Sequence, residues 1–443
     1  MDRRVLNATL FVEDLPKLIS ISYFSDMKAD ELLGAALSDG TYFSNPYPLF
    51  AQLRKEFPVF YSDHLGGWVV SRYLDVAEIL HNSDDYSSKG RVLHLIHQLD
   101  PGIQNQLPLL QMHFATGLAH SDAPEHKRLR GLLAQAFTPK MAEAMRPITQ
   151  EVVTRVLASL EDEADLISDL FTPVPAMVVG RLLGSAEADI PDLIRWAHAI
   201  NGLYEKGGRI APEKALHAEA MLEEMRGFVL RLVNERRALR DKGELNPQAD
   251  IMSALVGAEL NGDSLNESEL LSTAVTLFVA GHETTTHLLG NGLLGLLSSP
   301  GAIDRLREQP ELIKSAVDEM ARFDGSVPRS WRIAKREMVI AGITIPAGDL
   351  VLPMLASANR DETIFENPDS FDIERDTRKH LAFGRGIHVC LGAPLARVEG
   401  EEIVKALLCK FNNIGLQCSF TNLQWRSDVA LRGLISFPVH LSA

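Results

Sequence analysis

Apolar positions recur with helical spacing through most of residues 124–297, where they alternate with charged positions. β-forming residues gather elsewhere. Residues 59–61 and 68–70 flank Gly66-Gly67 and predict a hairpin, while residues 338–355 and 431–441 predict further short strands. The pattern therefore predicts a mainly α fold with a small β region.

The longest predicted helix begins after residue 264. Ser264 and Glu267 have the spacing of a capping box, and residues 298–300, Ser-Ser-Pro, end the helix near residue 297. About 30 residues at ~1.5 Å each make a rod of about 45 Å, long enough to cross a domain. A helix this long and mostly apolar is expected to be a buried spine, so the polar residues at its centre need an explanation.

The chain has 443 residues and shows neither an internal repeat nor a low-complexity linker. The first residues show no clear pattern of hydrophobic and polar positions, whereas a regular pattern begins at Thr41. We expect an N-terminal extension over residues 1–40 and a single domain over residues 41–443.

Composition excludes several classes of function. Lys and Arg number 44 against 59 Asp and Glu, which gives a net charge of −15 and no electrostatic footprint for nucleic acid. The three cysteines are too few for a secreted disulfide framework. Charges interrupt the apolar residues near the N-terminus, and no run of about 18 apolar residues follows. We expect a cytoplasmic protein without a membrane span.

The centre of the long helix, residues 280–287, reads Ala-Gly-His-Glu-Thr-Thr-Thr-His. His282 and His287 are five residues apart rather than four, which is the wrong spacing for a helical zinc motif. Instead, the Thr284 hydroxyl can bond the carbonyl of Ala280 and loosen that turn, and Gly281 would leave one face open. Glu283 beside Thr284 makes an acid–alcohol pair able to relay protons into a buried pocket. The alternative is an ordinary helix with threonines bonded to its own backbone.

A second motif surrounds Cys390 in residues 383–392, Phe-Gly-Arg-Gly-Ile-His-Val-Cys-Leu-Gly. The glycines predict a tight loop that enters a helix, where N–H groups would lower the pKa of the thiol. Such a sulfur can be a nucleophile, a redox thiol or a metal ligand. The alternative is a buried structural cysteine, although a structural cysteine does not need this glycine-rich backbone.

Five motifs in order resemble those of the cytochromes P-450, from about Thr41 to the C-terminus. Phe383-x-x-Gly386-x-x-x-Cys390-x-Gly392 resembles the family's haem-binding loop. Residues 280–285 resemble the oxygen-activation helix, and residues 126–130 resemble the haem-clamping helix. Glu319 and Arg322 resemble the Glu-x-x-Arg helix, and residues 371–375 resemble the segment whose arginine, here Arg375, binds to that helix. The resemblance implies the cytochrome P-450 fold, with the long central helix over a buried haem.

The resemblance also implies site residues. Haem b would be held by Cys390 as axial thiolate, a ligand that favours O–O cleavage. His126, Arg130, Arg332 and His388 would pair with its propionates, and Glu319, Arg322 and Arg375 would form a buried structural network.

The implied reaction is monooxygenation, in which one atom of O2 goes to the substrate and the other to water. Thr284 and Glu283 would be the catalytic residues, with Thr284 holding the reduced oxygen and its water and Glu283 supplying protons. Electrons would come from NAD(P)H through a separate ferredoxin or flavodoxin and its reductase, which Lys127, Arg128 and Arg385 could dock.

The family's pocket-lining segments are mainly apolar here, which implies a lipophilic substrate. The C-terminal residues look like those of bacterial members that tailor polyketides and macrolides, so hydroxylation or epoxidation of such a secondary metabolite is expected. Fatty acids, terpenoids and steroids stay open as substrates. Two rival functions are a haem-thiolate sensor without turnover and a cysteine hydrolase that uses Cys390 and a histidine, for which His388 is poorly placed.

Overall fold

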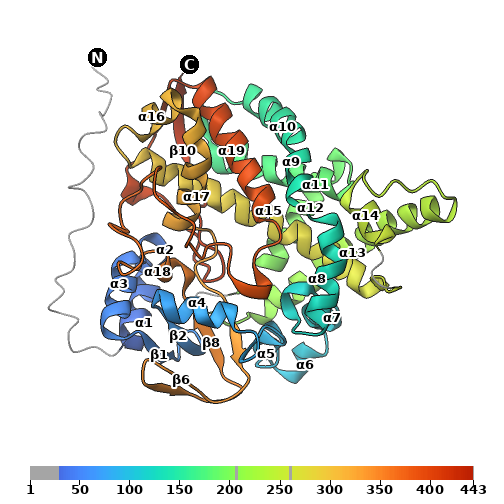
Figure 1. Cartoon of the computed structure of the whole chain (residues 1–443), viewed down its shortest axis with the longest axis horizontal. Helices are drawn as coiled ribbons and strands as arrows, with labels where there is room; N and C mark the ends of the chain where they lie inside the picture. The colour runs from blue at the N-terminus through green and yellow to red at the C-terminus, as the bar shows by residue number, and fades with distance from the viewer. Residues whose placement is uncertain (1–28, 205–207, 259–261, 443) are drawn as a thin grey trace.

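The computed structural model describes residues 29–204, 208–258 and 262–442. Helices build most of it. The main sheet lies at one end beside α1–α4, whereas the C-terminal strand lies at the opposite end near α16 (Figure 1). The helices of the first half are α1 (Ala29–Asp39), α2 (Thr41–Ser44), α3 (Tyr47–Glu56), α4 (Tyr73–His81), α5 (Arg91–Ile96), α6 (Pro101–Gln104), α7 (Pro108–Thr116), α8 (Glu125–Ala136), α9 (Pro139–Ala144), α10 (Arg146–Ala158), α11 (Pro173–Leu183) and α12 (Ile190–Asn201). Those of the second half are α13 (Pro212–Asp241), α14 (Ile251–Gly257), α15 (Glu267–Leu297), α16 (Ala302–Glu308), α17 (Ile313–Asp324), α18 (Leu355–Ala358) and α19 (Ala393–Lys410).

Helix α15 is the predicted spine. It packs against α11, α12, α13 and α17 and is buried for most of its length. Asn266 caps it by accepting a hydrogen bond from the Glu269 N–H, while the Glu269 carboxylate accepts one from the Asn266 N–H. The predicted capping box at Ser264 and Glu267 is therefore wrong by two residues, although the helix ends at Leu297 as expected.

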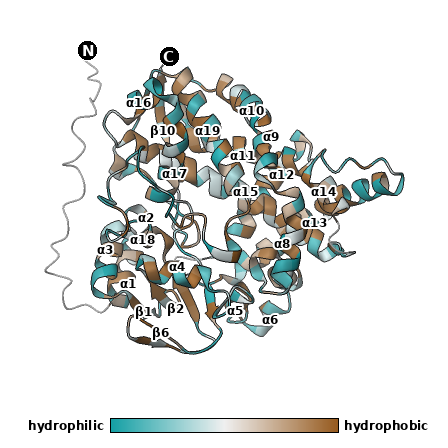
Figure 2. Ribbon diagram, viewed as in Figure 1, coloured by the Kyte–Doolittle hydropathy of each residue, from teal (hydrophilic) through white to brown (hydrophobic). Residues whose placement is uncertain are grey.

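The main sheet has the strand order β1-β2-β8-β5-β3, made of β1 (Val59–Ser62), β2 (Gly67–Val70), β8 (Leu350–Pro353), β5 (Arg332–Ala334) and β3 (Tyr86–Ser87). The predicted hairpin is present, with Val59 opposite Val70. β2 runs parallel to β8, and the other neighbouring pairs are antiparallel. Figure 2 shows hydrophobic residues along β1 and β2 and on the central helices around α15.

Two smaller sheets complete the β region of the described residues. One contains β4 (Glu163–Asp165), β10 (Pro438–Ser442) and β9 (Asn413–Leu416), and the other pairs β6 (Met338–Ile340) with β7 (Ile343–Ile345). The strand predicted over residues 431–441 thus begins only at Pro438. The mainly α fold with a small β region is confirmed.

The predicted extension over residues 1–40 needs a correction at its end. Ala29, Leu33 and Leu37 of α1 are buried in a cluster that also contains Phe50 of α3 and Leu352 of β8. Residues 29–40 therefore belong to the packed domain. The sequence signal was weak because α1 has only 11 residues, too short a stretch for its apolar spacing to stand out. Among the described helices none is both long and apolar enough for a membrane span.

Candidate functional site

Cys390 sits at the end of a tight loop that leads into α19. Its backbone N–H donates to the carbonyl of Phe383 at 2.8 Å, and Gly384 and Gly386 have φ values of +71° and +73°. A Cβ atom on Gly386 would lie 2.7 Å from the backbone oxygen of Leu80, so a side chain there would collide with α4. The loop thus needs its glycines both for backbone conformation and for close packing.

The Cys390 thiol is accessible to solvent, yet surrounding protein raises its pKa. The backbone N–H groups of Gly392 and Ala393, and the charges of Arg130 and Arg397, act in the opposite direction without overcoming that burial. The expected low pKa is therefore wrong for the free thiol, because desolvation outweighs the loop dipoles. An outward-facing sulfur on this backbone still suits metal ligation better than a structural role.

His126 of α8 and His388 of the cysteine loop lie side by side, with ring centroids 4.3 Å apart. The Nε2 atom of each is buried without a hydrogen-bond partner. Burial, with the nearby Arg332 guanidinium as the next cause, lowers the pKa of His388 to about 2. Two facing imidazoles with free nitrogens form a site ready to donate hydrogen bonds to an anion.

Two arginines stand next to these histidines. Arg130 donates to the carbonyl of Val389 at 3.0 Å, and burial lowers its pKa. Arg332, at the start of β5, is buried, which lowers its pKa to about 9. The structure therefore brings together all four residues predicted to meet the propionates. Two arginine guanidinium groups and two imidazoles able to donate hydrogen bonds fit the dianionic edge of a haem.

Sequence reasoning missed Arg91, which belongs to the same group. Its Nε lies 3.4 Å from Nδ1 of His120, and its charge adds to those that lower the pKa values of Arg332 and His388. No motif marks Arg91. Only the fold brings the start of α5 to this place.

On α15, the Thr284 hydroxyl donates to the Ala280 carbonyl at 2.5 Å, as predicted. The helix nevertheless continues unbroken through this turn. A Cβ on Gly281 would lie 3.2 Å from the Val179 side chain of α11, so the prediction that Gly281 opens a face was wrong. The exposed position here is Ala280, one residue earlier.

Glu283 is buried and points away from Thr284, because adjacent helix positions do not share a face. Its carboxylate forms an ion pair with Arg426 at 2.8 Å and accepts a hydrogen bond from Asn201 of α12. His198, also on α12, places Nε2 3.9 Å from the same carboxylate. The predicted acid–alcohol pair thus shares one helix turn without direct contact. The sequence analysis did not predict that Arg426, Asn201 and His198 lie near the Glu283 carboxylate.

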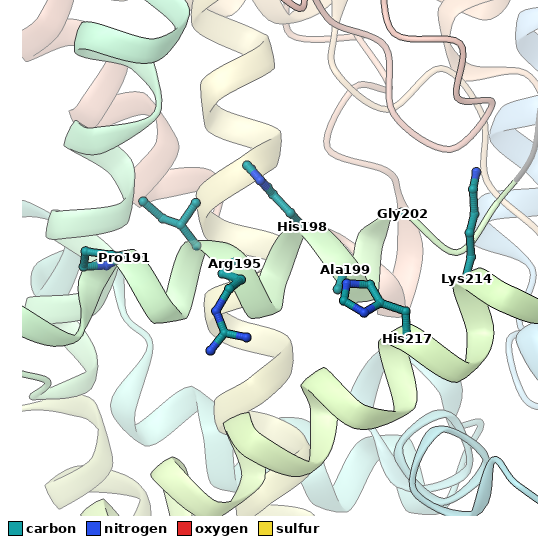
Figure 3. Close-up of a pocket in the computed structure, with 8 residues that line it drawn as sticks. Pro191, Arg195, His198, Ala199, Gly202, Lys214 and His217 are labelled. Carbon is teal, nitrogen blue, oxygen red and sulfur yellow. The ribbon is translucent and has the colours of Figure 1, made fainter.

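His198 connects that buried carboxylate to the surface. Its side chain is 49% exposed and lines an open groove of 540 Å³ between α12 and α13. Figure 3 shows Arg195 and His198 on one wall of the groove and Lys214 and His217 on the other. The groove lies on the α12–α13 side of Glu283, so it offers a solvent connection to the acid.

The Glu-x-x-Arg motif forms the buried network that the resemblance implied. Arg322 Nε donates to Glu319 at 2.6 Å, with both side chains fully buried, and Arg375 Nε donates to Glu319 at 3.2 Å. Arg322 also donates to the carbonyls of Asn359 and Pro368. The network ties α17 to the segment that precedes the cysteine loop.

The proposed docking cations need one correction. Arg128 is held by three carboxylates, Glu125, Asp263 and Glu269, so its charge is already neutralised. Lys127 and Arg385 are exposed.

Comparison with known proteins identifies the family. A family model described as Cytochrome P450 matches residues 209–415. Polyketide biosynthesis cytochrome P450 PksS of Bacillus subtilis (strain 168) is 34% identical over 409 residues, 90% of this chain and 96% of that protein. Cytochrome P450 monooxygenase PikC of Streptomyces venezuelae is 36% identical over 418 residues, 92% of this chain and 93% of that protein. The solved structure of cytochrome P450 CYP109Q5 from Chondromyces apiculatus has a TM-score of 0.80 and 30% identity, covering 92% of this chain and 98% of that one.

The fold and the ordered motifs define a haem-dependent oxidoreductase. This chain belongs to the cytochrome P450 family, and it is a monooxygenase.

Proposed function

We propose that this cytochrome P450 hydroxylates or epoxidises a lipophilic secondary metabolite of the polyketide or macrolide type. The observation that best supports a haem-thiolate site is the exposed Cys390 next to the Arg130, Arg332, His126 and His388 side chains. Relatives such as the polyketide biosynthesis enzyme PksS support the substrate class. Fatty acids, terpenoids and steroids are the alternatives within the same enzyme class.

In this proposal Cys390 binds the haem iron as a thiolate. Arg130, Arg332, His126 and His388 bind the propionates, which replaces the mutual repulsion of these groups by attraction. Bound haem b supplies the iron chemistry that activates O2.

The proton path begins at the groove in our proposal. His198 exchanges protons with solvent and passes them to Glu283, which Arg426 and Asn201 hold in place. Thr284, whose hydroxyl donates to the Ala280 carbonyl, would release that carbonyl and hold a proton at Oγ1 for the oxygen chemistry that haem would supply. Water bridges the distance between the two side chains, since they lie on different faces of α15.

Electrons come from NAD(P)H through a separate ferredoxin or flavodoxin and its reductase, and we place this supply in the cytoplasm. Lys127 and Arg385 provide exposed positive charge for an acidic carrier.

The first test is the visible spectrum of the purified protein, reduced with dithionite and exposed to carbon monoxide. A strongly red-shifted Soret band is expected for thiolate ligation, and Cys390→Ser should abolish it. A Soret band at the position of histidine-ligated haem, or no haem at all, would overturn the assignment of Cys390.

Thr284→Ala tests the oxygen step. We expect oxygen consumption to continue while product falls and hydrogen peroxide appears, because the hydroxyl that orients the proton source is gone. Thr276→Ala, about two turns earlier on α15, is the control and should stay coupled. Coupled product formation by Thr284→Ala would remove Thr284 from the proposed mechanism.

A further inference from the structure

Arg397 lies on α19, in the second turn of the helix that follows Cys390, and its guanidinium is fixed by two contacts. Its Nε atom donates to a carboxylate oxygen of Asp318 on α17 at 2.6 Å. Its guanidinium carbon lies 4.8 Å from the ring centroid of Phe383. Because the guanidinium is planar and charged, it can pair with a carboxylate and stack on an aromatic ring at once. The positive charge of Arg397 therefore has a defined position beside the cysteine loop.

Phe383 connects Arg397 to Cys390. The carbonyl oxygen of Phe383 accepts the backbone N–H of Cys390 at 2.8 Å, while its ring contacts the guanidinium. Burial raises the pKa of the Cys390 thiol, and the charges of Arg130 and Arg397 are among the causes that counteract it. Arg130 donates to the Val389 carbonyl from α8, whereas Arg397 approaches from α19. Two cations on different helices thus act on one sulfur.

Asp318 offsets part of the Arg397 charge. The two side chains are 22% and 32% exposed, so water screens the pair only in part. His380 Nε2 lies 3.9 Å from the same Asp318 oxygen, but burial lowers the pKa of His380 to about 4, and its imidazole is uncharged at neutral pH. His380 Nδ1 accepts the N–H of Ala382 at 3.2 Å, which places the imidazole proton on Nε2, toward Asp318. The charges of this group are therefore one fixed cation and one fixed anion.

We propose that the Arg397–Asp318 pair sets the reduction potential of the haem iron that Cys390 would bind. A fixed cation near the sulfur favours the form of the site that holds one more electron, and a fixed anion disfavours it. Asp318 therefore keeps the potential below the value that an unpaired Arg397 would give. The inference rests on the proposed role of Cys390, and its two residues lie outside the five family motifs.

The step that this pair controls is the transfer of one electron. The external carrier is oxidised, the ferric iron is reduced to the ferrous form, and no bond is made or broken. The test measures the potential of this couple in the haem-loaded protein, by anaerobic titration with dithionite in the presence of redox dyes. An ionic strength of about 0.1 M keeps the Debye length near 10 Å, so that distant charges are screened.

Two variants of the same ion pair should shift the potential in opposite directions. Arg397→Gln removes the cation and should make reduction about tenfold less favourable, which is about 59 mV for a one-electron couple. Asp318→Asn removes the anion and should raise the potential, and Arg397→Lys should keep most of the original value. A purely structural role would move the first two variants in the same direction, because both break the same contact.

Arg307→Gln is the control for loss of one positive charge. Arg307 donates to the Leu408 and Phe411 carbonyls at the far end of α19, about 20 Å along the helix from its start. Its removal should leave the potential unchanged. Shifts of equal sign in Arg397→Gln and Asp318→Asn, or shifts no larger than that of Arg307→Gln, would overturn the proposal.

The carbon monoxide spectrum of the same samples separates this inference from the assignment of Cys390. A red-shifted Soret band together with shifts of opposite sign supports both. The same band with unshifted potentials overturns only the role of Arg397 and Asp318. Slower electron transfer from a ferredoxin to Arg397→Gln at an unchanged potential would make Arg397 a docking residue and would also overturn it. Absence of the band in the original protein overturns the role of Cys390, and this inference with it.

Discussion

Glu399 on α19 is a buried carboxyl whose pKa is shifted by its surroundings. It is 1% exposed, one carboxylate oxygen has no partner, and burial raises its pKa well above the ordinary range, against a hydrogen bond with Thr285. Burial therefore favours the protonated form of this side chain in the folded protein, where it links α19 to the turn of α15 that carries Thr284.

Glu399 predicts a pH dependence of stability. In the unfolded chain the carboxyl ionises above its ordinary pKa of 4.5, while in the folded chain it stays protonated up to its raised pKa. Between these two values the unfolded state binds fewer protons, so stability falls as pH rises, by up to about 1.4 kcal/mol per pH unit. Glu399→Gln removes this loss, and its stability relative to the original protein should grow from pH 5 to pH 8 in urea unfolding. A difference that is the same at every pH would contradict the raised pKa.

Replacing His198 tests the proposed proton supply to Glu283. His198→Phe keeps a ring that can stack on His282, at 5.7 Å in this structure, but cannot carry a proton to Glu283. We expect product formation to fall about tenfold, less than the ~10²–10⁴-fold of a direct general acid, with a larger solvent deuterium isotope effect. His217→Phe changes the opposite wall of the same groove and should leave both unchanged. Equal behaviour of the two variants would remove His198 from the path.

Among the elements, the cysteine loop is fixed by its contact with α4. Gly386 and Gly90 both have positive φ, at +73° and +74°, but only Gly386 would place a Cβ against backbone atoms. Gly90→Ala should cost about 1–2 kcal/mol of stability through conformation alone. Gly386→Ala should cost about 1–3 kcal/mol more, since the loop must also shift away from α4. Urea unfolding of the two variants measures the difference, and haem content after gel filtration should fall only in Gly386→Ala.

Elements set by local pattern were predictable, and contacts between distant elements were not. The long apolar stripe predicted α15, and glycines between β-formers predicted the β1–β2 hairpin. Whether the helix face at Gly281 is open could not be predicted from α15 alone, because the Val179 side chain on α11 covers that face. The partners of Glu283 come from α12 and from Arg426 near the C-terminus, positions that no spacing rule relates to residue 283.

At the scale of the whole molecule, the site is assembled from segments far apart in the chain. His126, Arg332 and Cys390 come from α8, β5 and the loop before α19, and their shared location follows from the fold. The family motifs predicted these residues because the resemblance carries tertiary information that composition and periodicity lack. Arg91 belongs to none of the motifs, and only the structure shows that it lies near Arg332 and His388.

The N-terminal boundary of the domain gives the last prediction. Leu33 is 1% exposed and packs in the cluster that joins α1 to α3, to β8 and to Val429 near the C-terminus. Leu33→Ala should therefore lower the free energy of unfolding by about 2–5 kcal/mol, as for a core leucine. Leu74→Ala, at a position that is 70% exposed, should change it by no more than about 0.5 kcal/mol. Urea unfolding compares the two. If Leu33→Ala lowered the free energy of unfolding as little as Leu74→Ala, residues 29–40 would be an extension of the domain. The core around β8 would then be stable without α1.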